Sequence, residues 1–180
     1  MKNFTILVLL CLLTACQSTF YIVRHAEKAT QPKENPPLTE AGQQRAEDLK
    51  MLLADKKISR IYSTNTIRTF STAKPISSAR GVMIEYYSTK KVVNGTMTNQ
   101  NVQSDSLQIF IEELKKIKGK NVLIVGHSNT TKFVVNGLYE HDTLKNDLAD
   151  NEFDKLFIVK RKFSPRKTSF EMKSYGKVSL

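Results

Sequence analysis

Two unbroken apolar runs, each leading directly to a histidine, constrain most strongly what this chain can fold into. The first run, Phe20–Val23, leads into Arg24 and His25, and the second, Val122–Val125, leads into a glycine and His127. Short continuous apolar runs are typical of strands that a parallel sheet buries on both faces. We therefore expect two buried parallel strands with a histidine at each carboxyl end.

Between and around these runs, helical and strand patterns alternate. Thr39 is a good N-cap for a helix over Thr39–Asp55, and apolar residues at helical spacing predict an amphipathic helix over Leu107–Ile117. A helix containing Ile67 and Ile76 is expected to kink or end its first segment at Pro75. Further strands are expected at Ile58–Tyr62, Val82–Tyr87, Leu156–Lys162 and Thr168–Tyr175. The order predicts an α/β three-layer sandwich: a mostly parallel sheet, helices on both faces and an antiparallel C-terminal strand pair.

The first residues have a different character from the rest. Phe4–Leu13 is apolar, too short to span a bilayer and of the right length for a signal-peptide core. The sequence Leu13-Thr14-Ala15-Cys16 then resembles a bacterial lipoprotein cleavage box. We expect a lipoprotein signal peptide over residues 1–15, a domain over residues 16–180, and a lipid on Cys16 that anchors it in the cell envelope, periplasmic or outward-facing. A plain secretory signal with a chance cysteine is the alternative.

The cysteines and the net charge limit the possible disulfides and the class of binding partner. The two cysteines are Cys11, in the segment expected to be removed, and Cys16, so no intrachain disulfide is expected in the mature chain. The net charge of +11 favours anionic partners such as phosphorylated substrates or lipid headgroups. Basic residues form loose clusters at Lys115–Lys120 and Lys160–Lys167, without the aromatic-basic pattern of a nucleic-acid binder.

The carboxyl ends of parallel strands are where α/β sheets bind ligands. His25 and His127 are expected there, with Arg24 beside the first and Arg68 one turn into the helix that follows the Ile58 strand. Arginine forks match phosphate oxygens, a neutral imidazole can act as the nucleophile, and adjacent arginine charges should lower the imidazole pKa and keep it neutral. The backbone amides after His127, at a helix start capped by Ser128, Asn129 or Thr130, add a further anion site.

Four motifs resemble those of one family. Arg24–Lys28 resembles the Arg-His-Gly/Ala signature of the histidine phosphatase (phosphoglycerate mutase-like) superfamily. Pro37–Gly42 is similar to its Leu-Thr-x-x-Gly helix start. Tyr62–Thr69, leading to Thr72-Ala73, is similar to its Ser-x-x-x-x-Arg-Thr-x-x-Thr-Ala element, and Gly126–Ser128 resembles its second-histidine motif. The motifs occur in family order.

The resemblance implies an activity and roles. It implies a phosphatase in which His25 accepts the phosphoryl group as a phosphohistidine that water then hydrolyses. It assigns phosphate binding and transition-state stabilisation to Arg24, Arg68 and His127, and it implies no metal or organic cofactor. The substrate is expected to be a phosphorylated small molecule or phosphoprotein, selected by the loops Ala26–Leu38 and Thr89–Gln103.

The sequence departs from the family in one respect. The Glu and the Gly/Trp-rich stretch of mutase members have no clear counterpart between Glu85 and Gln103, which argues for a phosphatase and leaves the general acid unassigned. Glu27, Glu85 and Asp105 are the candidates.

Two other functions stay open. One is a metal-dependent hydrolase using His25, His127, His141 and Asp142, although these residues lack a tight ligand spacing. The other is a catalytically silent lipoprotein that binds phosphorylated ligands or an envelope partner.

Overall fold

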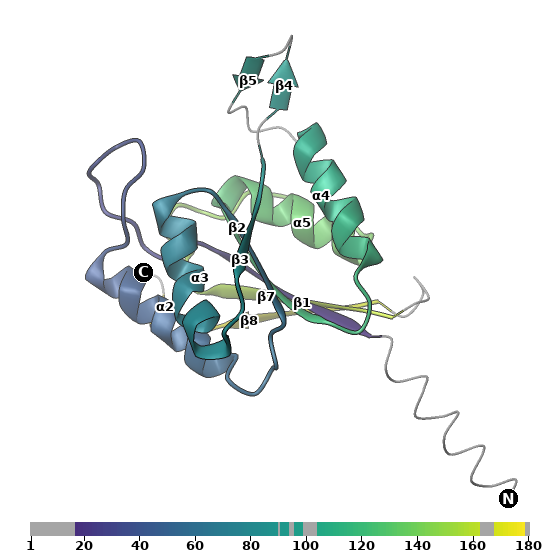
Figure 1. The fold of residues 1–180 in the computed structure, drawn as a ribbon. Helices are drawn as coiled ribbons and strands as arrows, with labels where there is room; N and C mark the ends of the chain where they lie inside the picture. The colour runs from purple at the N-terminus through teal and green to yellow at the C-terminus, as the bar shows by residue number, and fades with distance from the viewer. Residues whose placement is uncertain (1–16, 90, 94–95, 99–103, 163–167, 179–180) are drawn as a thin grey trace, which may run out of the picture.

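Strand β1 (Ser18–Arg24) lies near the centre of a six-stranded sheet, between β6 (Asn121–Gly126) and β7 (Lys155–Arg161) (Figure 1). The computed structural model describes residues 17–89, 91–93, 96–98, 104–162 and 168–178. The predicted signal peptide and Cys16 lie outside the described residues. Within these ranges, no helix combines the length and apolarity needed to cross a membrane.

The sheet has the order β3-β2-β6-β1-β7-β8, with β1, β2, β3 and β6 parallel and β7 antiparallel to both of its neighbours. This confirms the predicted mostly parallel sheet with an antiparallel C-terminal pair. The remaining strands of the sheet are β2 (Arg60–Thr64), β3 (Ile84–Tyr87) and β8 (Ser169–Ser174). A separate antiparallel pair, β4 (Lys91–Val93) and β5 (Thr96–Thr98), lies within Thr89–Gln103, which sequence analysis expected to be a loop.

Four described helices cover the two faces. They are α2 (Glu40–Leu52), α3 (Ile67–Arg80), α4 (Asp105–Lys116) and α5 (Ser128–Tyr139). Figure 1 shows α2 and α3 on one side of the sheet and α4 and α5 on the other. Successive strand residues point to opposite faces, so Tyr21 packs into the α2–α3 core while Phe20 and Ile22 pack into the α4–α5 core. Both runs are buried on two faces, as their sequences predicted.

Two local expectations had different outcomes. Thr39 caps α2 as predicted, because its side chain accepts a hydrogen bond from Gly42 N at 3.1 Å. Of the two outcomes expected at Pro75, a kink or an end of the helical segment, the end is wrong, since α3 continues to Arg80. Proline has no N–H, so the carbonyl of Ser71, four residues earlier, has no hydrogen-bond donor within the helix. Both residues line a groove open to solvent, where water can donate to that carbonyl.

Candidate active site

A cleft of about 1120 Å³ opens at the carboxyl ends of β1, β2 and β6. The four residues that sequence analysis expected to meet, Arg24, His25, Arg68 and His127, all line it. Parallel neighbours bring strand ends to one edge, and the register aligns Arg24 with Gly126, the residue before His127. The cleft also receives side chains from the loops after β1, β3 and α5: Lys28, Glu34, Asn35, Ser88, Asp147 and Asp150.

His25 is held in one tautomer by the backbone. Its Nδ1 lies 2.8 Å from the Ala26 carbonyl oxygen, and because a carbonyl only accepts, Nδ1 must carry the proton. The ring is 3% exposed, and burial lowers the pKa of His25 to about 3, helped by His127, Arg24 and Arg68. The imidazole is therefore neutral near pH 7, with an unprotonated Nε2. Sequence analysis named the arginine charges as the cause, whereas burial is the larger effect.

His127 is held in the opposite tautomer. Arg68 Nη2, which only donates, lies 3.4 Å from His127 Nδ1, so Nδ1 accepts and Nε2 carries the proton in the neutral ring. That Nε2 lies 2.8 Å from Thr64 Oγ1. Burial, followed by Arg68 and Arg24, lowers the pKa of His127 to about 4. The two rings meet edge-to-face, with centroids 5.5 Å apart.

Arg24 is fixed by a loop far away in sequence. Its Nη1 donates to the carbonyl oxygens of Ala149 at 2.6 Å and Asp150 at 3.1 Å, and more weakly to that of Glu152 at 3.3 Å. The guanidinium lies 4.2 Å above the Phe153 ring centroid. Arg24 is 4% exposed, so backbone dipoles and an aromatic face replace the water that its charge would otherwise bind.

Both arginines keep an unused donor. Arg24 Nε and Arg68 Nε are buried and have no hydrogen-bond partner in the described structure. A buried unpaired donor is costly unless a ligand satisfies it. Burial lowers the pKa of both guanidinium groups, yet an arginine stays protonated near neutral pH. The cleft thus holds two fixed positive charges, each with an unsatisfied N–H, which suits a phosphate-sized oxyanion.

Two hydroxyl residues contribute to the cleft, Ser128 by lining it and Thr72 by joining two of the segments that form it. The N-cap of α5 is His127, so the expectation that Ser128, Asn129 or Thr130 caps this helix was wrong. Ser128 is the first residue of α5 and lines the cleft, where the helix start can still bind an anion. Thr72, buried in α3, accepts from Ala26 N at 2.9 Å and donates to Arg68 O at 2.8 Å. Its hydroxyl therefore ties the loop after His25 to the helix that carries Arg68.

Comparison with known proteins agrees with this geometry. Residues 20–94 match the family model described as the histidine phosphatase superfamily (branch 1), a range that contains His25 and Arg68. The matched range covers less than half of the chain. His127 lies beyond the matched range, and the structure brings it to the other two residues. No curated protein matches the sequence.

Solved structures share the fold at low sequence identity. The protein histidine phosphatase SixA in complex with tungstate aligns with a TM-score of 0.64 and 16% identity, over 87% of this chain and 96% of its own. Bacillus stearothermophilus YhfR gives a TM-score of 0.60 and 20% identity, over 90% and 98%. A mycobacterial glucosyl-3-phosphoglycerate phosphatase gives 0.59 and 10%, over 88% and 98%. At these identities the likeness concerns the fold.

Glu27, the candidate acid nearest to His25 in the sequence, forms an ion pair. Arg45 donates to both of its carboxylate oxygens, with contacts of 2.6 to 3.0 Å. Burial is the largest single effect and opposes ionisation of Glu27, but the hydrogen bonds from Arg45, a backbone hydrogen bond and the charges of Arg45 and Arg24 together lower the pKa of Glu27. Arg45 is 4% exposed and also donates to the carbonyls of Tyr175 and Lys177. The Glu27 carboxylate thus supports the fold behind the cleft and does not line it.

The other two candidate acids also lie outside the cleft. Glu85 is on β3 and is paired with Arg60 at 2.9 Å, and Asp105 is the exposed first residue of α4. Neither lines the cleft. The carboxylates that do line it are Glu34, Asp147 and Asp150, which sequence analysis did not name because their loops carry no motif.

The three-histidine metal centre is not formed. His141 follows the C-terminal end of α5 and contacts Tyr139, whereas His127 caps the other end of the same twelve-residue helix, roughly 18 Å away. Within the described ranges, no group of three or more His, Cys, Asp or Glu side chains is arranged to hold a metal ion.

Sequence analysis missed two residues that hold side chains of the candidate site. Thr64 ends β2 as Arg24 ends β1, so the same strand-end argument would have found it. Phe153 stacks on Arg24 from an irregular segment before β7, and nothing in the local pattern indicates it.

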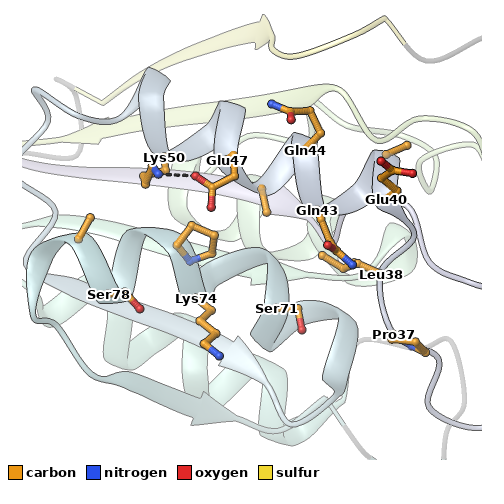
Figure 2. Close-up of a pocket in the computed structure, with 14 residues that line it drawn as sticks. Pro37, Leu38, Glu40, Gln43, Gln44, Glu47, Lys50, Ser71, Lys74 and Ser78 are labelled. Carbon is orange, nitrogen blue, oxygen red and sulfur yellow. Dashed lines mark hydrogen bonds and ion pairs between the residues drawn. The ribbon is translucent and has the colours of Figure 1, made fainter.

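A second groove, of about 1260 Å³, lies between α2 and α3. Figure 2 shows Gln43 and Glu47 of α2 along one side, Ser71 and Lys74 of α3 along the other, and Glu47 paired with Lys50. It contains neither histidine and neither site arginine. Its size alone therefore does not make it the reactive site.

Proposed function

We propose that the protein is a phosphatase that hydrolyses phosphate monoesters through a phosphohistidine on His25. The observation that carries this proposal is the protonation pattern of His25: Nδ1 donates to Ala26 O, which leaves the Nε2 lone pair for attack. The pKa of about 3 keeps that lone pair available at neutral pH.

The reaction balances with groups of this chain and water. His25 Nε2 attacks phosphorus, the bond from phosphorus to the ester oxygen breaks, and the leaving oxygen takes a proton from an acid at the cleft mouth. Water then attacks the phosphohistidine and gives one proton to the carboxylate that served as the acid. The bond from phosphorus to Nε2 breaks, which releases inorganic phosphate and regenerates the neutral imidazole and the protonated acid. The fixed charges of Arg24 and Arg68 stabilise the phosphoryl oxygens throughout, and no metal or organic cofactor is needed in this scheme.

The proton donor remains to be chosen among the cleft carboxylates. Asp147 is paired with Lys132 at 2.8 Å, so Glu34 and Asp150 are the better candidates. Glu34→Gln and Asp150→Asn should be compared on substrates with good and poor leaving groups. The variant that lacks the acid loses turnover of the poor leaving group while keeping that of the good one.

The main test is a small panel of phosphoesters assayed with wild type and His25→Ala. Wild type should hydrolyse at least one ester and, after brief incubation with a phosphate donor, carry an acid-labile, base-stable phosphate on His25. The tungstate complex of SixA suggests tungstate as an inhibitor here as well. Equal turnover by His25→Ala would refute the proposal.

A silent phosphate-binding lipoprotein is the second candidate, favoured by the position of all three predicted acids outside the cleft. It predicts saturable tungstate binding by wild type with neither turnover nor a labelled histidine.

We further propose that a lipid on Cys16 anchors the domain in the cell envelope. Strand β1 begins at Ser18, so a lipid on Cys16 would hold the sheet close to its membrane. Cys16→Ala should move the protein to a soluble fraction with its activity intact. If this variant stays in the membrane after a high-salt wash, the anchor is refuted.

A further inference from the structure

The end of the sheet opposite the cleft carries exposed lysines from three separate segments. We define the basic rim as Lys57, Lys120, Lys160 and Lys162, all of which are exposed. They come from the loop before β2, the loop before β6 and the end of β7, so only the tertiary fold gathers them.

Hydrogen bonds hold these segments around the start of β1. Thr19 N donates to Lys120 O at 2.9 Å, and Ser59 N donates to Asn121 O at 2.9 Å, which joins the loop before β2 to the start of β6. On the other side, Ser18 pairs with Arg161 and Thr19 with Lys160 in the antiparallel register. The segments that carry the rim lysines therefore lie around the start of β1.

The positive charge of the rim is not neutralised by its surroundings. Carboxylates of the neighbouring segments are taken by other basic residues: Asp55 by Lys56, Glu85 by Arg60, Glu113 by Lys116 and Glu140 by Arg161. In the described ranges, no rim lysine has a carboxylate within ion-pair distance. The cleft end differs, since the exposed acids Glu34, Asp147 and Asp150 line its mouth.

We propose that the basic rim lies against the anionic headgroups of a phospholipid bilayer. Lysines near such a surface each add attraction, and several together give binding that salt weakens. The rim surrounds Ser18, two residues after the predicted lipid site, so lipid and lysines would contact the same surface. The seven residues of β1 separate the rim from His25 by roughly 20 Å, so the cleft faces away from the membrane and stays open to substrate.

Lysine labelling in the full chain tests the contact. The protein is reconstituted into vesicles of neutral phosphatidylcholine, or of phosphatidylcholine with about 30% anionic phosphatidylglycerol. An amine-reactive reagent and mass spectrometry then report each lysine. The rim lysines should be labelled several-fold less on the anionic vesicles, and high salt should restore their labelling. Lys74 and Lys173, away from the rim, should change little. Equal labelling of rim and control lysines would overturn the proposal.

A matched pair of variants provides the second readout. Lys120→Gln/Lys160→Gln/Lys162→Gln should bind anionic vesicles at least about tenfold more weakly than Lys74→Gln/Lys145→Gln/Lys173→Gln, which removes the same charge elsewhere. The segment before Ser18 is identical in both, so the difference reports the rim. Equal affinity would refute the proposal, as would protection of the rim lysines by a duplex oligonucleotide but not by anionic vesicles. These readouts do not use turnover, so they stand or fall independently of the phosphatase proposal.

Discussion

The two halves of the cleft hold their histidines by different chemistry. In the β1 half, backbone carbonyls hold His25 and Arg24. The carbonyl of Ala26 orients His25, and those of residues 149, 150 and 152 accept hydrogen bonds from Arg24. In the β6 half, side chains do so, because Thr64 and Arg68 hold His127. Carbonyls accept and guanidiniums donate, so the two rings are forced into opposite tautomers.

This difference separates the proposed roles of two residues of the same type. His25 presents an unprotonated Nε2, as a nucleophile must, whereas Nε2–H of His127 is used by Thr64 and its Nδ1 by Arg68. We therefore assign the covalent step to His25 and charge stabilisation to His127.

The largest predicted effect is the loss of activity on removal of His127, which should separate the roles of the two histidines. His127→Ala should lower kcat/KM by about 10²–10³-fold, since it removes stabilisation of the transition state but leaves the nucleophile. Rapid-quench labelling should still detect the phosphohistidine, which forms more slowly. His25→Ala is the control and should show no label. A His127→Ala protein that turns over normally but never labels would reverse the assignment.

The ion pair behind the β1 half should matter for stability and not for chemistry. Glu27→Gln should lower the free energy of unfolding by about 1–3 kcal/mol, because buried Arg45 loses its charged partner. Urea denaturation measures this, and activity per folded molecule should be unchanged. Glu47→Gln breaks an exposed pair with Lys50 and should cost far less. A large loss of kcat in Glu27→Gln with intact stability would restore Glu27 as the acid.

Both halves should make stability sensitive to mild acid. The folded pKa values of His25 and His127, about 3 and about 4, lie below the unfolded value near 6.5. Their stabilisation is therefore complete above about pH 6.5 and declines as the pH falls toward the folded values. Between pH 7 and 5.5 the loss should be on the order of 1 kcal/mol per histidine. Thermal melting of wild type, His25→Gln/His127→Gln and the exposed control His141→Gln measures it. The same slope in the double variant would contradict the burial argument.

The smallest effect is expected from removing the Thr64 hydroxyl, which tests whether its hydrogen bond orients His127 in the β6 half. Thr64→Val should lower kcat about fivefold with KM nearly unchanged, because a hydrogen bond worth about 1 kcal/mol no longer orients His127. Thr64→Ser keeps the hydroxyl and should recover activity. If valine and serine behave alike, the hydroxyl does not position His127.

Individual residues show which features of the fold and the site could be predicted from the sequence. Thr39 and Gly42 predict the start of α2 from local chemistry, and the fold explains the glycine: a Cβ there would lie 2.2 Å from Glu27 O. Position in the sequence points to Glu27 and Glu85 as candidate acids. In the structure each forms an ion pair with an arginine that only the fold brings near. Glu34, Asp147 and Asp150 reach the cleft from loops without periodicity, so no local signal predicted them.

The sequence by itself determined the buried strands, the helix starts and the placement of two histidines at strand ends, because apolar periodicity and capping act over a few residues. The tertiary structure decided which imidazole has a free Nε2, which acids face the cleft, and where the rim lysines gather. Those properties depend on burial and on hydrogen-bond partners from segments far away along the chain. The carbonyls of residues 149, 150 and 152, which hold Arg24, are an example.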